Sequence, residues 1–151
     1  MKRGILFVVS GPSGAGKGTV MGEVFKRIND LNFSVSATTR APRSGERDGV
    51  NYRFVTNEEF DRMIAEGEML EFIEKFTNRY GTPKFAVESL LNQGKDVLLE
   101  IETTGASNVK RLMPECVSIF IAPPSLSALW ERLSGKILFI SATTVSVPIR
   151  P

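Results

Sequence analysis

The most chemically distinctive segment of the chain is rich in glycine and ends in a lysine. It reads Gly11-Pro12-Ser13-Gly14-Ala15-Gly16-Lys17 and fits the spacing G-x-x-x-x-G-K. Glycines let successive backbone N–H groups turn toward phosphate oxygens, and the lysine adds a mobile positive charge for the β- and γ-phosphates. The segment therefore predicts a phosphate-binding site, although a glycine-rich run could by itself be an ordinary turn.

The two residues after the lysine bear on the metal ion. Gly18 stands where this motif has Ser or Thr to hold Mg²⁺, and the first hydroxyl belongs to Thr19. We therefore expect Mg²⁺ to be held mostly by phosphates and water, with Thr19 contacting phosphate. No side chain of the chain is predicted as a metal ligand.

The elements on either side of this loop are those that such a site needs. Residues 5–9 form a continuous apolar run typical of a strand covered on both faces. Downstream, apolar residues recur with the spacing of one helix face, namely Val20, Met21, Val24, Phe25 and Ile28. A strand, a glycine loop and a helix in this order predict the start of an α/β domain.

The rest of the chain continues this alternation. We expect strands at residues 33–37, 52–55, 69–76, 97–101 and 117–121. We expect helices after an N-cap at Asn57, at residues 83–92 and 106–112, and after a cap at Ser125 as far as about 133. Residues 40–51 are polar and read as a loop. The pattern predicts a mainly parallel sheet flanked by helices.

Composition excludes several classes of protein. The 151 residues fit one domain, and the absence of histidine removes histidine bases, Ser-His-Asp triads and His-ligated zinc. A net charge of +2 favours neither a nucleic-acid partner nor a membrane surface. The single cysteine, Cys116, suits a reducing compartment, and we expect a cytoplasmic protein with Cys116 and Trp130 as packing residues. The sequence predicts no oligomeric state.

A second constellation lies downstream of the loop. It reads Thr38-Thr39-Arg40-Ala41-Pro42-Arg43-Ser44-Gly45-Glu46, followed by Tyr52. Taken alone, the two arginines could be surface charges. Together with the glycine loop, this T-T-R-x-P-R-x-G-E…Y pattern resembles the guanylate kinase family, whose members transfer a phosphoryl group from ATP to GMP. The resemblance covers residue 5 to about 135.

The resemblance implies a fold and a set of site residues. The fold would be a P-loop NTPase-type parallel sheet with an inserted GMP-binding β subdomain at about 34–83, inside a domain at 1–135. The GMP phosphate would be held by Arg40, Arg43, Tyr52 and Tyr80, with Lys17 and the two arginines as catalytic residues. Guanine would be read by Glu71 with Thr82, Ser36 and Glu102, and Glu100 would lie near the Mg²⁺–phosphate region.

Glu71 has the chemistry that guanine recognition needs. Guanine offers its N1–H and exocyclic amine as parallel donors, and a carboxylate has two acceptor oxygens to face them. Adenine has an acceptor at N1, which the carboxylate would repel. Without the surrounding motif, Glu71 could instead be a solvent-facing strand residue.

The resemblance weakens in two places. Thr103 and Thr104 stand where the family often has an apolar residue and glutamine, and Glu100 and Glu102 stand where it often has aspartates. After about residue 135 the family's arginine-rich lid and last elements find no match, which predicts a truncated or divergent chain with weakened or absent transfer activity. The tail at 136–151 could add a strand or remain exposed. The alternatives are a peptide-binding domain of the same fold, an inactive remnant and a relaxed nucleoside-monophosphate kinase.

Overall fold

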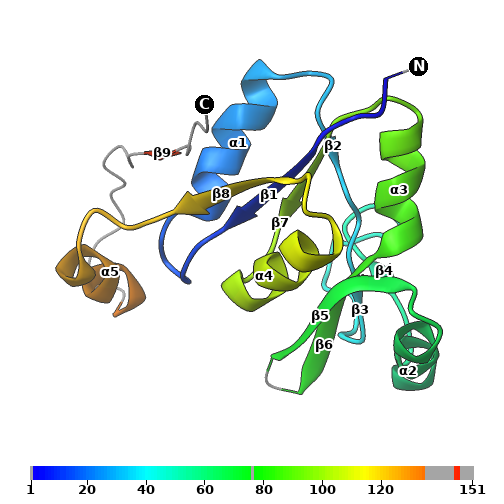
Figure 1. Ribbon diagram of the computed structural model, residues 1–151. Coiled ribbons are helices and arrows are strands. Elements are labelled where there is room, and N and C mark those ends of the chain that lie inside the picture. Colours follow the sequence, from blue (N-terminus) through cyan, green and yellow to red (C-terminus); the bar gives the residue numbers. More distant parts are fainter. Residues whose placement is uncertain (1, 76, 135–144, 147–151) are drawn as a thin grey trace.

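The computed structural model describes residues 2–75, 77–134 and 145–146 as an α/β protein (Figure 1). Its helices are α1 (Lys17–Arg27), α2 (Asn57–Ala65), α3 (Lys84–Asn92), α4 (Thr103–Leu112) and α5 (Leu126–Leu133). Its strands are β1 (Leu6–Ser10), β2 (Asn32–Phe33), β3 (Ala37–Thr38), β4 (Arg53–Phe54), β5 (Met69–Lys75), β6 (Asn78–Pro83), β7 (Val97–Glu100), β8 (Val117–Ile121) and β9 (Val145–Ser146).

The larger sheet has five strands in the order β2-β7-β1-β8-β9. Strand β1 pairs in parallel with β7 on one side and β8 on the other, and β2 pairs in parallel with β7. Strand β9 is antiparallel to β8. The predicted mainly parallel sheet is confirmed, and its central strand β1 leads directly into the glycine-rich loop at residues 11–16.

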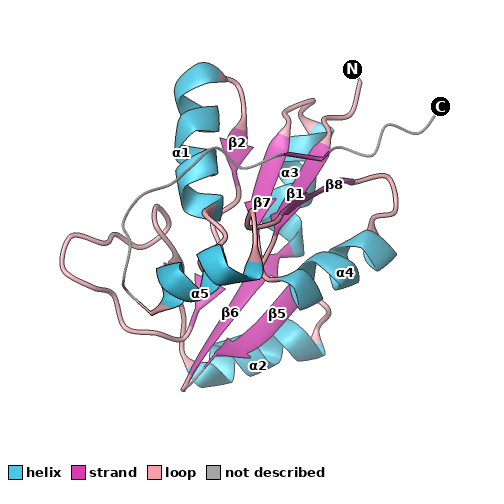
Figure 2. Cartoon of the chain, turned by 90° about the vertical axis from the view of Figure 1, so that its left-hand side faces the viewer, coloured by secondary structure: helices cyan, strands magenta, loops and turns pink. Residues whose placement is uncertain are grey.

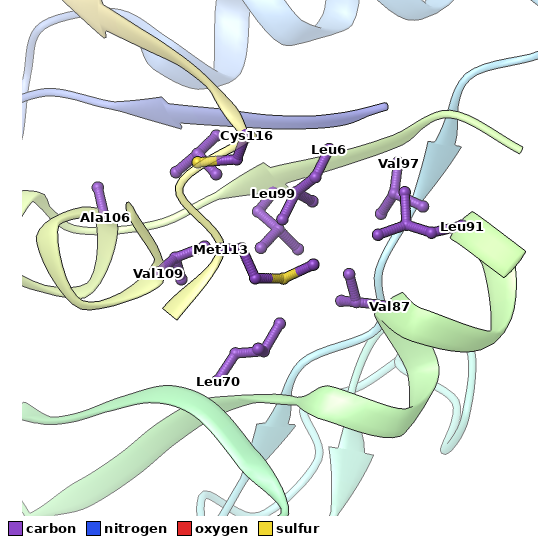
Figure 3. Close-up of a cluster of buried hydrophobic side chains, with 11 residues drawn as sticks. Leu6, Leu70, Val87, Leu91, Val97, Leu99, Ala106, Val109, Met113 and Cys116 are labelled. Atoms are coloured by element: carbon purple, nitrogen blue, oxygen red, sulfur yellow. The ribbon is translucent and has the colours of Figure 1, made fainter. Parts of the chain in front are cut away.

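Helices cover both faces of this sheet, which is why its central strands β1 and β7 are mostly apolar. Along β1 the side chains alternate, so that Leu6 and Val8 belong to one core and Val9 to another. The Val9 core packs against α1. The Leu6 core contains residues of α3 and α4, and Leu70 joins it from the second sheet (Figure 3).

The second sheet is smaller and has four strands in the order β4-β3-β6-β5. Strands β5 and β6 form an antiparallel hairpin in which Glu71 lies opposite Thr82. Helix α2 covers this sheet through a core of its own, made by Ala37, Phe60 and Met63. Helix α4 of the larger sheet lies beside the β5–β6 hairpin (Figure 2), so this helix joins the two halves of the molecule.

Several expected elements differ from those observed. The single strand predicted at 33–37 is two strands, β2 and β3, in different sheets. The chain leaves the larger sheet after the Ser34 N–H donates to the carbonyl of Leu98, and it enters the smaller sheet at Ala37. Strand β6 was not predicted, because its polar sequence becomes a strand only by pairing on both sides with β3 and β5.

The observed helix boundaries differ from the predicted ones by up to a few residues. The predicted cap Asn57 is wrong, since Thr56 caps α2 by accepting the N–H of Glu59 at 3.1 Å. Helix α4 begins at Thr103 and not at 106, and α3 begins after Pro83. The predicted Ser125 cap on α5 is confirmed, with its hydroxyl accepting the N–H of Ala128.

Expectations about packing and the tail have mixed outcomes. Cys116 is buried in the main core, as predicted, whereas Trp130 is 72% exposed on α5, so its reading as a packing residue is wrong. The apolar spacing of α5 turns Leu129 and Leu133 toward the glycine-rich loop and leaves Trp130 outside. Within the tail, Val145–Ser146 forms β9, and residues 135–144 and 147–151 lie outside the described residues.

Candidate active site

The glycine-rich loop connects β1 to α1 through backbone conformations that only glycine adopts easily. Gly14 and Gly16 have φ angles of 80° and 97°. At Gly11, with φ at 154°, an added Cβ would lie 2.2 Å from the carbonyl oxygen of Ile121 in the neighbouring strand. The loop thus needs its glycines both to curl and to pass close to β8.

Two cationic side chains, Lys17 and Arg132, donate hydrogen bonds to carbonyl groups of this loop. The Lys17 ammonium donates to the carbonyls of Gly11 at 2.7 Å and Pro12 at 3.3 Å. From α5, the Arg132 guanidinium donates to the carbonyls of Gly14 at 3.2 Å and Ala15 at 3.1 Å. Sequence reasoning missed Arg132, since one arginine in a distant helix carries no pattern that ties it to the loop.

One cleft of about 500 Å³ lies between the two sheets, and it brings together some of the predicted site residues but not residues 11–16, Gly18 or Thr19. Nearly all the residues expected to bind GMP line it, namely Ser36, Arg40, Arg43, Tyr52, Glu71, Tyr80, Glu100 and Glu102. Lys17 lines the same cleft from the loop side. Of the predicted GMP-binding set, Thr82 alone is not a lining residue. It is buried behind Glu71.

Arg40 is held in place by Glu46. Its guanidinium donates to both oxygens of the Glu46 carboxylate, at 3.0 and 2.9 Å, and the same carboxylate accepts the backbone N–H of Arg43 at 2.7 Å. The bond from Arg40 holds the pKa of Glu46 below its ordinary value, and Glu46 in turn raises the pKa of Arg40. Glu46 was quoted within the motif but not predicted to have this role.

Two tyrosines stand beside this arginine. The Arg40 guanidinium carbon lies 5.5 Å from the centre of the Tyr52 ring, and the Tyr52 and Tyr80 rings meet edge to face at 6.1 Å. Tyr80 comes from β6 and is fixed opposite Thr38 of β3. A cation and two phenol groups therefore converge from three separate segments on one end of the cleft.

Glu71 occupies a buried position in the same cleft. It is only 6% exposed, and the Thr82 hydroxyl donates to its carboxylate at 2.6 Å. Burial raises the pKa of Glu71, and the hydrogen bonds from Thr82 partly offset that rise. The solvent-facing alternative for Glu71 is wrong.

Comparison with known proteins identifies a family whose model matches most of this chain. The family model described as guanylate kinase matches residues 3–138. The guanylate kinase of Clostridioides difficile (strain 630) is 54% identical over 136 residues, covering 90% of this chain and 66% of that protein. The guanylate kinase of Shouchella clausii (strain KSM-K16) is 50% identical over 135 residues, covering 89% and 66%.

A solved structure of a guanylate kinase is also similar to this chain in fold. The crystal structure of guanylate kinase from Anaplasma phagocytophilum superimposes with a TM-score of 0.70 at 39% identity, covering 89% of this chain and 69% of that one. This chain belongs to the guanylate kinase family. It spans about two thirds of the length of the curated relatives named above, at 66% of each.

Two further carboxylates complete the cleft of this guanylate kinase family member. Glu100 ends β7 and lies opposite Val9 in the sheet register, next to the start of the glycine-rich loop. Glu102 is the N-cap residue of α4, and its carboxylate forms an ion pair of 3.1 Å with Lys75 of β5. Among the described ion pairs, this one joins the two sheets across the cleft. Lys75 was not predicted.

The described residues contain no group of three or more His, Cys, Asp or Glu side chains that could hold a metal ion. None of the helices in the described ranges is both long and apolar enough to cross a membrane. The cleft of this guanylate kinase family member combines the Lys17 ammonium, an arginine–tyrosine cluster and a buried carboxylate.

Proposed function

We propose that this protein transfers the γ-phosphoryl group of ATP to GMP and forms GDP. One observation carries the proposal: a single cleft is lined by Lys17, the last residue of the glycine-rich motif, and by Arg40, Tyr52, Tyr80 and Glu71. Such a cleft can bind two nucleotides with their phosphates facing each other. The family membership and the 54% identity to a guanylate kinase support the same reaction.

The proposed phosphate end of the GMP site is the arginine–tyrosine cluster. A phosphate dianion suits two guanidinium groups, which can each donate to two oxygens, and two phenols, which donate one bond each. Arg40 is already held by Glu46, so little freedom of Arg40 is lost on binding. Arg43 lines the cleft beside it and supplies the second guanidinium.

The proposed guanine end is Glu71 with Thr82, Ser36 and Glu102. The buried Glu71 carboxylate has one oxygen engaged by Thr82, which limits its rotation. Its oxygens can face the N1–H and amine of guanine in parallel. A buried site of this kind rejects a base that cannot match it, because its polar groups would lose their partners.

The residues of the glycine-rich loop fit the phosphates of ATP. The glycines at positive φ turn the backbone toward a ligand, and α1 begins at Lys17 without an acidic residue in its first turn. Residues 11–19 would therefore bind the triphosphate, with Lys17 leaving the loop carbonyls for the phosphate oxygens. Bound Mg²⁺ would neutralise charge on the phosphates, with Glu100 and Thr19 as the nearby oxygen groups of this chain.

The proposed chemistry needs neither a covalent intermediate nor a histidine base. A phosphate oxygen of GMP is already a competent nucleophile, so the protein has to align two nucleotides and stabilise the charge on the transferred group. Lys17, Arg40 and Arg43 line the cleft and are the cations proposed to stabilise this charge, while the fourth lining cation, Lys75, is paired with Glu102. Enclosing both substrates would keep water from acting as the acceptor.

A coupled assay with ATP, Mg²⁺ and GMP tests the proposal. We expect ADP formation that depends on GMP and is lost in Lys17→Ala, with AMP and CMP as poor acceptors. Calorimetry with GMP alone separates binding from transfer. A folded chain that binds neither nucleotide would refute the proposal, and equal rates with AMP would refute the guanine preference.

A further inference from the structure

Helix α4 contains a glycine that the helix itself does not need. Gly105 is the third residue of α4, it is buried, and it is absent from the glycines with positive φ. A glycine in a helix costs about 1 kcal/mol relative to alanine. Something other than backbone conformation must therefore account for glycine at this position.

The neighbour of Gly105 across the sheet junction is the buried carboxylate of Glu71. A Cβ built on Gly105 would lie 2.6 Å from Glu71 Oε2 and 3.1 Å from its carboxyl carbon. The first distance is shorter than real Cβ contacts, and the second is a tight one. The carboxylate therefore occupies the space that any other residue at position 105 would fill.

The other oxygen of the same carboxylate is Oε1, which accepts the Thr82 hydroxyl at 2.6 Å. Glu71 is thus confined on two sides, by Thr82 of its own hairpin and by α4 of the larger sheet. The first turn of α4 also presents backbone N–H groups without helical partners, whose partial positive charge favours a carboxylate. The orientation of the Glu71 carboxylate depends on how closely α4 approaches it.

We propose that Gly105 is a positioning residue for guanine recognition, because its missing side chain leaves the space in which the Glu71 carboxylate packs. This inference rests on the proposed function, in which Glu71 reads the guanine edge. A side chain at 105 would push the carboxylate away from α4 and strain its bond to Thr82. Because the obstructed atom ends a flexible side chain, the carboxylate moves and the fold remains.

The variant Gly105→Ala tests this, with Gly22→Ala as its matched control. Gly22 is an exposed helical glycine of α1, and a Cβ there meets nothing within 4 Å. Both changes put a better helix former in a helix, so both variants should fold, and any loss of melting temperature in Gly105→Ala relative to Gly22→Ala measures the strain on Glu71. We expect Gly105→Ala to weaken GMP binding by about 10- to 100-fold, the order of loss that a misplacement of about 1 Å causes. Gly22→Ala should bind GMP as the parent does.

A double-mutant cycle separates positioning from a general effect on the cleft. In a Glu71→Ala background there is no carboxylate to displace, so adding Gly105→Ala should leave GMP affinity unchanged. An equal loss from Gly105→Ala in both backgrounds would overturn the proposal. So would parent-like GMP affinity in Gly105→Ala alone.

Carbon-13 NMR of the glutamate carboxyl groups gives a readout that does not depend on GMP. The Glu71 resonance, identified by its loss in Glu71→Ala, should shift in Gly105→Ala and stay in place in Gly22→Ala. If the parent failed to bind GMP, the proposed function would fall. A shifted Glu71 resonance would then still support the positioning of this carboxylate by Gly105, and an unshifted one would overturn it.

Discussion

The glycine-rich loop that leads to Lys17 is backbone from one uninterrupted stretch, residues 11–17, whereas the GMP-binding residues proposed on the smaller sheet are side chains from β5, β6 and the segment between β3 and β4. On the loop side, glycine conformations and one lysine define the surface. On the other side, Arg40, Tyr52, Glu71 and Tyr80 come together only because β3, β4, β5 and β6 pair. Substitutions on the loop side should therefore mainly affect phosphoryl transfer, and substitutions on the opposite side should mainly affect GMP recognition.

The largest effect should come from Lys17→Ala on the loop side. Removing the charge that would stabilise the transferred phosphoryl group should lower kcat by about 10³-fold. GMP affinity, measured by calorimetry, should stay within about twofold, since the proposed GMP ligands belong mainly to the other side. Lys26→Ala, an exposed lysine of α1 paired with Glu23, is the control. Loss of GMP binding in Lys17→Ala would show that the two sides are not separable.

On the opposite side, Glu71→Gln should mainly affect recognition. An amide places a donor where guanine also has donors, so GMP affinity should fall by about 10²-fold while affinity for ATP is kept. Glu74→Gln lies on the same strand with an exposed side chain and should leave GMP affinity unchanged. Isothermal calorimetry with each nucleotide checks both statements. Unaltered GMP affinity in Glu71→Gln would remove this residue from the guanine site.

The raised pKa of Glu71 predicts opposite pH trends for stability and binding. Its pKa is raised by burial above the ordinary value of 4.5. Between 4.5 and the raised value the folded state holds a proton that the unfolded state has released, so the free energy of unfolding falls as pH rises. Over the same window GMP affinity should increase, because the carboxylate form pairs with guanine.

Denaturant unfolding and GMP calorimetry across pH measure these two slopes. Glu71→Gln is the reference, because it keeps the titration of the GMP phosphate but lacks the carboxyl group. The difference between parent and variant should show the falling stability and the rising affinity together. A parent with the same two pH profiles as Glu71→Gln would contradict the assignment.

A smaller effect is expected from Glu46→Gln. The change weakens the paired hydrogen bonds that orient Arg40 but leaves the guanidinium in the cleft. GMP affinity should fall by about fivefold to tenfold, with kcat reduced to a similar extent. Glu66→Gln breaks an exposed arginine pair on α2 and serves as the control. If both variants bind GMP equally well, Arg40 does not need Glu46 for its orientation.

The smallest effect should follow Lys75→Met, which removes the ion pair with Glu102 across the cleft. Both side chains are partly exposed, so the pair contributes little and is screened by salt. We expect a change of about twofold in the KM for GMP at low salt that disappears at high salt. Lys84→Met, whose partner Glu88 lies 3.9 Å away on α3, should change nothing.

The elements next to the glycine-rich loop were predictable because their determinants are local. Strand β1 follows from an apolar run predicted at residues 5–9 and is observed at Leu6–Ser10. Helix α1 follows from a helical spacing of apolar residues, and Lys17–Arg27 contains all of them except Ile28, its C-cap residue. The split of the predicted strand at 33–37 was not predictable in this way. It depends on which distant strand offers hydrogen bonds to each residue, Leu98 to Ser34 and Gly81 to Ala37.

The candidate site likewise contains residues that a local sequence pattern predicts and residues that only contacts between distant segments bring into place. The motif residues Arg40, Arg43 and Tyr52 were found because family patterns lie in consecutive sequence. Glu46 as the partner of Arg40, Arg132 at the loop and Lys75 opposite Glu102 were missed. Each acts through a neighbour that only folding brings close.

By itself, the sequence determined the chemical groups available to this protein: no histidine, a glycine-rich loop that ends in lysine, paired arginines and the carboxylate proposed to face the base. It also determined the α/β alternation, because apolar periodicity is a local property. The tertiary structure alone decided that Glu71 is buried, that Thr82 bonds to it and that Gly105 leaves room for it. Burial and steric fit are properties of pairs of segments far apart in the chain, and no local pattern encodes the distance between them.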